Sequence, residues 1–484
     1  MINILKKKEI LFLVFILLLG FFLRIYALGD QMHMISDQGW FFLSARDLLI
    51  TGEIPLVGIT SSHTWLHQGP IWTYILAGVL WVGNYNPLFA GYFSVFLDLL
   101  TILVIYKVCR ELFSNEIAGI SGILYATSPL IIIYSRMPYH TSPIPFLSLL
   151  FLFSLFRWVK GNHIYFPISV FICALLYNFE LATVLFPMIL VMFLVYGIWK
   201  KKKWAKIFNK KIISLNILAL TPMIPILIYD FKNGFFQTIK FGGWLFFQAL
   251  GSIGLDLIPQ DPHPSWHSFF TFFIYEFRRI SFYRSEGIST VILFTVIVLN
   301  ILFIYSLYKS KKFKINFSVF YLTSFVLFSG FISQRESSGA YLTMLFPYIV
   351  ILISLATLSL RRNEKKIVYL LLVLIIPFLN SYYLLKEYRS IEVGGLRKLI
   401  QASEFIVKDS NGERIQLERK NFKSNNDIHQ YRYLVWWKGG KLDANFRIEY
   451  GIYNATEWKP ENYIYDDGTI YITKTEKKTI VLIK

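Results

Sequence analysis

Long apolar segments recur along most of the chain, and short polar connections separate them. A helix needs about 20 consecutive apolar residues to cross a bilayer. The pattern predicts an all-α polytopic membrane protein with about eleven crossings, at residues 10–28, 88–108, 117–134, 143–158, 164–179, 181–199, 212–229, 288–308, 315–332, 340–360 and 367–385.

Two apolar stretches need separate treatment. Residues 71–83 form a run shorter than a bilayer requires, so we expect an interfacial or re-entrant helix there. Residues 10–28 follow a basic start and look superficially like a signal peptide, but the run is longer than a signal core and further crossings follow it. We therefore expect an uncleaved first transmembrane helix.

Basic clusters predict which ends of the crossings face the cytoplasm. Lys and Arg concentrate at residues 6–8, 201–211, 309–314 and 361–366, beside or between apolar runs. Cytoplasmic loops of membrane proteins are enriched in these residues. The N-terminus then lies on the inner side of the cytoplasmic (plasma) membrane, and a first outer loop covers about residues 29–87.

The composition agrees with a membrane protein. Hydrophobic residues make up 55% and charged residues 16% of the 484 residues, whereas soluble domains carry about a quarter charged residues. The net charge of +19 does not indicate nucleic-acid binding, because the basic residues follow the topology. Cys109 and Cys173 lie in or beside apolar runs, so we expect core residues and no disulfide or metal site.

The tail of the chain has a different composition, because charges of both signs return after about residue 386. Residues 395–413 predict an amphipathic helix that ends at a Gly. Strands are predicted at residues 432–437, 446–453 and 463–474, the last with Asp-Gly turn chemistry. We expect a transmembrane domain over 1–387 and a small α+β domain over 388–484, which lies outside because the number of crossings is odd.

Polar side chains gather at the outer face on this topology. Transfer of a sugar from a polyprenyl phosphate needs a carboxylate that takes the proton of the attacking hydroxyl and cations that stabilise the phosphate. Asp37 is the candidate base, and the candidates for the phosphate are Arg136, Lys232 and Arg335. Further candidates for substrate binding are His67, Tyr139 and His140.

Each candidate also has a structural explanation. Ser36 and Asp37 can simply begin the helix that follows them, and Arg136 can extend to the lipid headgroups. His67 and His140 can be ordinary loop residues. The acids and histidines have no metal-motif spacing, so a divalent metal is possible but unsupported.

Six stretches carry a family resemblance: LGFFLRIYAL at 19–28, SDQGWFFLSARDLLITGEIP at 36–55, HQGPIWTYILAGVLWVG at 67–83, residues 106–146, PILIYDFKNGF at 225–235 and YLTMLFP at 341–347. They resemble the GT-C membrane glycosyltransferases, most closely the protein O-mannosyltransferase and aminoarabinose-transferase branch. The resemblance is strong over about residues 1–160 and patchier to about 385. It does not extend to the tail.

The resemblance implies an outward-facing site, a polyprenyl-phosphate-linked sugar as donor, and transfer with inversion. The family's catalytic acid of the first loop matches Asp37, and Arg136 matches a recurrent Ser-Arg. The chain departs from the family at Gln38, where many members have a second acid. The turn 136–140 also lacks the acid that many members carry there, which weakens a shared carboxylate site and any metal shared with related oligosaccharyltransferases.

The leading interpretation is a glycosyltransferase that moves a hexosyl or pentosyl group from a polyprenyl-phosphate donor to an outer-face acceptor. Two other classes stay open: a non-enzymatic flippase or transporter of lipid-linked glycans, and a membrane-anchored binding protein that acts through its tail. Few ionisable residues lie deep in the crossings and the acids gather at one face, which favours the enzyme. A protein, a lipid and a polysaccharide are all open as the acceptor.

Overall fold

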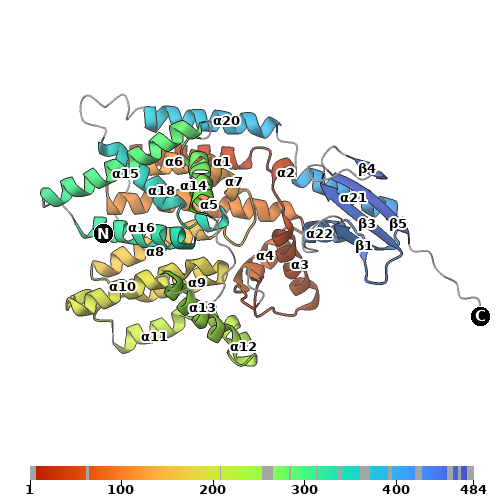
Figure 1. Ribbon diagram of the computed structural model, residues 1–484, viewed down its shortest axis with the longest axis horizontal. Helices are drawn as coiled ribbons and strands as arrows, with labels where there is room; N and C mark the ends of the chain where they lie inside the picture. The colour runs from red at the N-terminus through yellow and green to blue at the C-terminus, as the bar shows by residue number, and fades with distance from the viewer. Residues whose placement is uncertain are drawn as a thin grey trace, which may run out of the picture.

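Helices form most of the chain, and a small sheet follows them near the C-terminus (Figure 1). The structure is a computed structural model, which describes all residues except 1–6, 61–64, 208, 253–264, 283–284, 312–313, 335–338, 360–370, 391–394, 420–427, 455–461, 467–469 and 477–484.

The helices before the basic connection near residue 200 are α1 (Lys7–Ile25), α2 (Leu28–Gln31), α3 (Ser36–Thr51), α4 (Ile71–Val82), α5 (Pro87–Leu112), α6 (Asn115–Thr127), α7 (Pro129–Ser135), α8 (Ile144–Val159), α9 (Tyr165–Phe179), η1 (Leu181–Val184) and α10 (Leu185–Trp199). Those after it are η2 (Lys203–Ala205), α11 (Lys210–Ala219), η3 (Thr221–Met223), α12 (Ile224–Lys232), α13 (Phe236–Ser252), α14 (Trp266–Ser281), α15 (Glu286–Lys309), α16 (Ile315–Gln334), α17 (Gly339–Leu342), α18 (Phe346–Ser359), the π-helical η5 (Leu371–Ile375) and α20 (Ile376–Ser390).

Five continuous helical segments in the described part of the chain are long and apolar enough to cross a membrane. They are α5, η1 with α10, α11 through α12, α15, and α16, and the bent pair α6–α7 adds a sixth if it is one crossing. Shorter apolar helices, among them α8, α9 and α18, cover other predicted crossings. The helical membrane fold is confirmed, while the number of eleven crossings stays a prediction.

The crossing predicted at 117–134 is broken in the middle. α6 ends at Thr127 and α7 begins at Pro129, and the two helices are bent by 64°. A proline has no N–H for the helical ladder and holds the residue before it in extended backbone, as at Ser128. α7 therefore leads in a new direction into the turn that carries Arg136.

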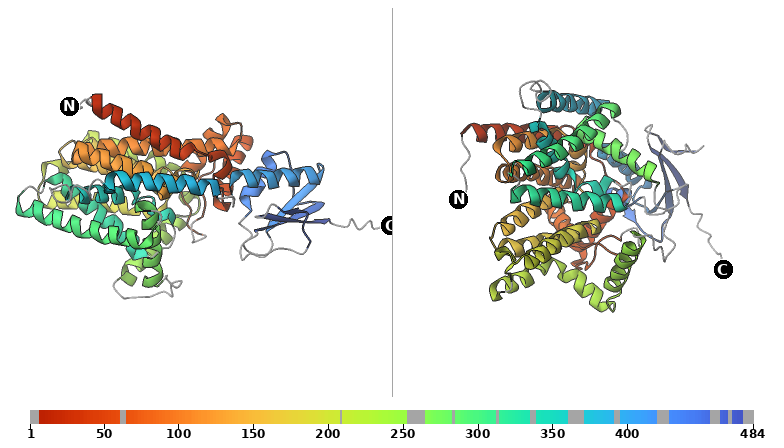
Figure 2. Two further views of the ribbon diagram at one scale, coloured as in Figure 1. Left: turned by 90° about the horizontal axis from the view of Figure 1, so that it is seen from above. Right: turned by 60° about the vertical axis from the view of Figure 1, so that its left-hand side comes forward.

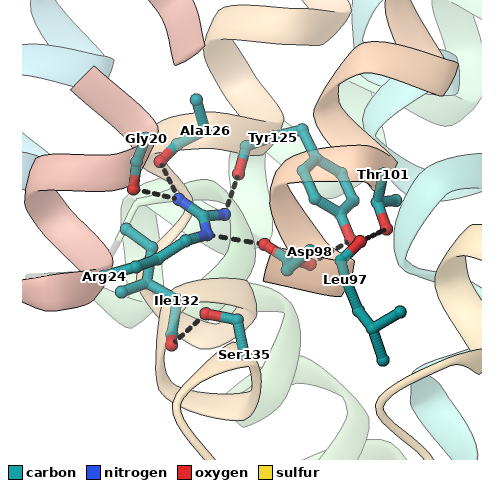
Figure 3. Close-up of polar contacts among 9 residues, drawn as sticks. All are labelled: Gly20, Arg24, Leu97, Asp98, Thr101, Tyr125, Ala126, Ile132 and Ser135. Carbon is teal, nitrogen blue, oxygen red and sulfur yellow. Dashed lines mark hydrogen bonds and ion pairs between the residues drawn. The ribbon is translucent and has the colours of Figure 1, made fainter. Parts of the chain in front are cut away.

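A buried ion pair joins this break to α1 and α5 (Figure 3). The Nε of Arg24 donates to an oxygen of Asp98 at 2.6 Å, and both side chains are buried. Arg24 also donates to the carbonyls of Ala126 at 2.9 Å and Tyr125 at 3.4 Å, and the Tyr125 hydroxyl donates to Asp98 at 2.8 Å. These carbonyls belong to the last turn of α6, where the helix itself supplies no donor.

The tail contains α21 (Leu396–Ser410), α22 (His429–Trp437) and the strands β1 (Arg414–Arg419), β2 (Lys441–Leu442), β3 (Ile448–Asn454), β4 (Tyr465–Asp466) and β5 (Ile470–Glu476). The strands form one sheet in the order β2-β1-β3-β5-β4, in which β1 pairs parallel with β2 and β3. β5 pairs antiparallel with β3 and β4. The predicted amphipathic helix, the strand at 446–453 and the strand pair at 463–474 are confirmed, and the Asp-Gly turn lies outside the described residues.

The strand predicted at residues 432–437 is wrong, because this segment belongs to the helix α22. Its aromatic and β-branched residues favour a strand by local preference alone. In the structure, Tyr433 packs on Phe42 of α3 and Trp436 packs on Tyr85. Helical spacing of three residues places both rings on one face, so contacts with the bundle outweigh the local preference.

The sheet and α3 lie at one end of the bundle, opposite the start of α1 (Figures 1 and 2). A Cβ on Gly39 of α3 would lie 2.0 Å from the backbone nitrogen of Gln430, so α22 begins in direct backbone contact with α3. The Tyr433 hydroxyl donates to the Tyr85 carbonyl at 2.7 Å, and the Leu396 N–H donates to the Met32 carbonyl at 2.9 Å. The predicted boundary at 387/388 stays a prediction.

Candidate active site

Asp37 lies in the first turn of α3, and its side chain is exposed. The next residue, Gln38, is fully buried, and its Oε1 accepts a 2.6 Å hydrogen bond from the Ile35 N–H. Its Nε2 donates to the Pro138 carbonyl at 3.5 Å. The residue at which the chain departs from the family pattern thus fixes the start of α3 to the turn after α7.

Tyr139 is the direct partner of Asp37. Its hydroxyl donates to Oδ2 of Asp37 at 2.9 Å. Burial raises the pKa of Tyr139, and the neighbouring charge of Asp37 raises it further. The hydroxyl therefore stays protonated at neutral pH, holds one carboxylate oxygen and leaves the exposed carboxylate able to meet an approaching hydroxyl.

The turn that carries Tyr139 is held by Ser142. The Ser142 hydroxyl donates to the Met137 carbonyl at 2.9 Å and accepts the Tyr139 N–H at 3.2 Å. The Ser142 N–H donates to the Tyr139 carbonyl at 2.9 Å. These local bonds give the turn a defined conformation without help from helix or sheet.

Positive charge gathers around His33, between α2 and α3. Burial lowers the pKa of His33, and the charges of Arg136 and Arg279 lower it further. Arg136 is only 3% exposed, which argues against an extension to the headgroups. Arg279 comes from α14, which packs on α7, and it pairs with Glu276 at 3.3 Å.

Arg279 was not among the candidates from sequence. Its segment lies between two predicted crossings, and no local pattern shows that α14 returns to α7. The only signal was its basic pair with Arg278 in the last turn of a strongly amphipathic stretch, which is typical of an interfacial helix.

His140 lies beside Tyr139, with ring centroids 4.0 Å apart. Its Nε2 lies 3.2 Å from an oxygen of Glu180, and the Nε2 of Gln68 donates to the same oxygen at 3.3 Å. Glu180 comes from the connection between α9 and η1, a turn that the sequence places at the outer ends of two crossings. The structure thus brings a second carboxylate toward the turn that lacks one of its own.

The remaining candidates do not contact Asp37 among the described residues. His67 packs on Tyr229, and its backbone exchanges hydrogen bonds with Gln237 at 3.3 and 3.1 Å. The pKa of His67 is lowered from its ordinary value, because the effect of burial exceeds that of a side-chain hydrogen bond with Gln237, which raises it. Lys232 is exposed at the end of α12 and forms no ion pair with a described side chain, and Arg335 lies outside the described residues.

The described parts of the chain contain no group of three His, Cys, Asp or Glu side chains that could hold a metal ion. His140 and Glu180 bring two such side chains together, one fewer than a metal site built from side chains normally uses.

Comparison with known proteins identifies the class of fold. A family model for dolichyl-phosphate-mannose-protein mannosyltransferase matches residues 67–229. The structure is similar to ArnT from Cupriavidus metallidurans bound to undecaprenyl phosphate, with a TM-score of 0.60 and 11% identity over 97% of this chain and 98% of that chain. The apo state of ArnT gives a TM-score of 0.59 at 10% identity over 96% and 97%.

A second neighbour is the archaeal oligosaccharyltransferase AglB from Archaeoglobus fulgidus, in complex with an inhibitory peptide and a dolichol-phosphate. Its TM-score is 0.53 at 12% identity, over 89% of this chain and 60% of that chain. No curated protein sequence matches the chain.

The chain therefore has the fold of the GT-C membrane glycosyltransferases, and the resemblance predicted from sequence is confirmed. Within that class, residues 67–229 match the mannosyltransferase family model, and the whole chain has the architecture of ArnT.

Proposed function

We propose that the chain is a membrane glycosyltransferase that moves a sugar from a polyprenyl-phosphate-linked donor to an acceptor at the outer face of the cytoplasmic membrane. The observation that carries this proposal is the exposed Asp37 carboxylate, held by Tyr139 on the turn that also carries Arg136. The undecaprenyl phosphate bound to ArnT and the dolichol-phosphate bound to AglB support a lipid phosphate as part of the donor.

Asp37 acts as the general base in this proposal. An acceptor hydroxyl approaches the exposed carboxylate, which takes the proton while the oxygen attacks the anomeric carbon. The bond from that carbon to the phosphate oxygen breaks, and the polyprenyl phosphate leaves with the electron pair. A single displacement of this kind inverts the anomeric centre. Tyr139 keeps its own proton and orients the base.

Arg136 and Arg279 serve the leaving phosphate in this proposal. Negative charge increases on the phosphate as the glycosidic bond breaks, and fixed cations in a site of low dielectric stabilise it. Both guanidinium charges act on His33, whose backbone lies three residues before α3. Arg136 ends α7 three residues before Tyr139, which bonds Asp37, and the helix α14 that carries Arg279 packs on α7. A phosphate beside these cations can therefore place its sugar beside the base.

The arrangement of the bundle supports an outer-face site. The start of α1 and the end of α15 lie at one end of the bundle, and α3 and the sheet lie at the other (Figure 1). Basic connections between the membrane helices lie at the first of these ends, for example Lys200–Lys203 after α10 and Lys309 at the end of α15. Basic connections face the cytoplasm, and this supports our proposal that Asp37 and the sheet face outward.

The experiment uses the full chain in proteoliposomes with radiolabelled undecaprenyl-phosphate sugars and envelope material of the native host as the acceptor source. A glycosyltransferase forms a labelled product and releases undecaprenyl phosphate. A flippase moves the labelled lipid across the bilayer with no new glycosidic bond. A binding protein that acts through its tail does neither, and either of the last two results overturns the proposal.

A further inference from the structure

The Gln68, His140 and Glu180 side chains form a buried polar cluster that the proposed base and cations do not use. They are 5%, 4% and 7% exposed, and they come from three separate segments of the chain. The cluster lies directly behind Tyr139, whose ring packs on His140. It is therefore next to the proposed base and not part of a remote core.

Backbone contacts hold Gln68 and Glu180 in place. The Gln68 N–H donates to the Ile59 carbonyl at 2.9 Å, and the Gln68 carbonyl accepts from the Gly58 N–H at 2.8 Å. The second carboxylate oxygen of Glu180 accepts the Ala182 N–H at 3.4 Å and so caps η1.

Two atoms of the cluster are buried and have no hydrogen-bond partner among the described residues: Nδ1 of His140 and Oε1 of Gln68. A carboxylate only accepts hydrogen bonds, so the Nε2 atoms of both side chains donate to Glu180. The Nε2 atoms of Gln68 and His140 also lie 3.4 Å apart beside this carboxylate. In the tautomer that carries its proton on Nε2, His140 presents a lone pair at Nδ1, and Gln68 presents its amide oxygen. Buried polar atoms are almost always hydrogen-bonded, and these two acceptors require donors.

Charge identifies the kind of donor. A phosphate offers acceptors and a negative charge, and the carboxylate of Glu180 repels it. Sugar hydroxyls are neutral donors, and a carboxylate, an imidazole, an amide and aromatic rings are suitable partners for them. The Phe41 ring lies 5.3 Å from the His140 ring and supplies an apolar wall.

We propose that Gln68, His140 and Glu180 form a sugar subsite, in which Nδ1 of His140 and Oε1 of Gln68 accept hydrogen bonds from two hydroxyl groups of the donor sugar. This inference rests on the proposed function. The reacting atoms must approach to about 3–3.5 Å, so a sugar ring whose anomeric carbon faces Asp37 extends over Tyr139 toward this cluster. Glu180 is a positioning residue here, because it acts on the sugar only through the other two.

The test compares two lipids on the full-length protein in nanodiscs: undecaprenyl phosphate alone, and undecaprenyl phosphate carrying a hexose, taken from a panel with mannose, glucose and galactose. Gln68→Met removes the amide and keeps the length of the side chain. We expect this variant to bind at least one sugar-bearing lipid about tenfold more weakly than wild type. Its binding of undecaprenyl phosphate should be unchanged. Glu180→Gln gives a smaller loss of the same kind, because His140 and Gln68 keep a partner.

Asn300→Leu is the matched control, because it removes a buried amide that contacts Tyr321 and the Leu352 carbonyl; both lipids should bind this variant as they bind wild type. Donor lipids whose sugar lacks a single hydroxyl test the same point on wild-type protein. Removal of either of two adjacent hydroxyls should weaken binding about tenfold relative to the complete donor.

The outcomes separate the two proposals. If wild type does not bind undecaprenyl phosphate, the proposed function falls and the subsite falls with it. If it binds that lipid but Gln68→Met affects both lipids equally or neither, and no deoxy position matters, the subsite alone is overturned.

Discussion

The Tyr139 hydroxyl donates a 2.9 Å hydrogen bond to Asp37, although 102 residues separate the two in the chain. The bond connects the start of α3 to the turn after α7. The direction of that turn follows from the helix break between Thr127 and Pro129. Arg24, paired with Asp98, holds the end of α6 at this break by donating to the Ala126 carbonyl. The geometry of the proposed base is therefore decided well away from the base itself.

Tyr139→Phe tests the orienting role of this bond. A hydrogen bond to a charged group contributes about 1.5–3 kcal/mol, so we expect transfer about 10- to 100-fold slower at saturating donor. Undecaprenyl phosphate should bind as before, because Tyr139 does not face the phosphate in the proposal. Tyr321→Phe, which removes the hydroxyl bonded to Asn300 on α15, should leave the rate unchanged. Equal rates in Tyr139→Phe and wild type contradict the orienting role.

Arg24→Met tests the ion pair behind the helix break. The change leaves the Asp98 carboxylate buried without its cation, which typically costs about 3–5 kcal/mol of unfolding free energy. The double variant Arg24→Met/Asp98→Leu should recover much of that loss. Reversible unfolding in mixed micelles measures both. Arg414→Met breaks an exposed ion pair with Asp443 in the tail and should cost less than about 1 kcal/mol.

Gly39→Ala tests the contact between the bundle and the tail. Its Cβ would lie 2.0 Å from the Gln430 nitrogen, and backbone cannot yield as a flexible side chain can. We expect α22 to separate from α3, so that limited proteolysis cuts the tail faster than in wild type. Gly78→Ala, in the helix α4 with open space around its Cβ, should not change the cleavage rate and should stabilise the helix by up to about 1 kcal/mol. Unchanged cleavage in Gly39→Ala means that the two helices do not touch at this point.

His33→Gln tests the electrostatics beside Arg136 and Arg279. The folded pKa of His33 is lowered, so below about pH 6.5 the unfolded chain binds more protons than the folded one. The free energy of unfolding therefore decreases as the pH falls from 7 toward 5. The decrease should be smaller in His33→Gln, with the part due to His67 remaining. The control His267→Gln, at an exposed position on α14, should show the same decrease in the free energy of unfolding as wild type. If His33→Gln also shows the wild-type decrease, His33 is not coupled to folding.

Much of the fold could be predicted from local patterns. Apolar runs indicated the membrane helices, the amphipathic spacing of residues 395–413 indicated α21, and the Asp-Gly signal indicated the pairing of β4 with β5. Short-range rules work at these places because the pattern that they detect is itself what the structure buries or exposes. α22 failed the same rules, because its partners on α3 lie almost 400 residues away in the chain.

The candidate site was only partly predictable. Asp37, Tyr139 and His140 were candidates because they follow crossings at one face, and the structure brings them together. Glu180 contacts His140, 40 residues away in the chain, and Gln68 contacts Glu180, 112 residues away. Spacing rules cannot predict contacts over such separations. The sequence indicated only that Gln38 replaces the second acid of many family members. The structure shows that Gln38 is buried, caps the start of α3 and donates to the Pro138 carbonyl.

The most direct measurement of the central claim is the rate of sugar transfer by Asp37→Asn, with Asp47→Asn as the matched exposed acid on the same helix. A general base contributes about 10²- to 10⁴-fold to a rate. We predict a loss of that size in Asp37→Asn, with unchanged thermal unfolding and unchanged binding of undecaprenyl phosphate, and a rate close to wild type in Asp47→Asn. A wild-type transfer rate in Asp37→Asn contradicts the account.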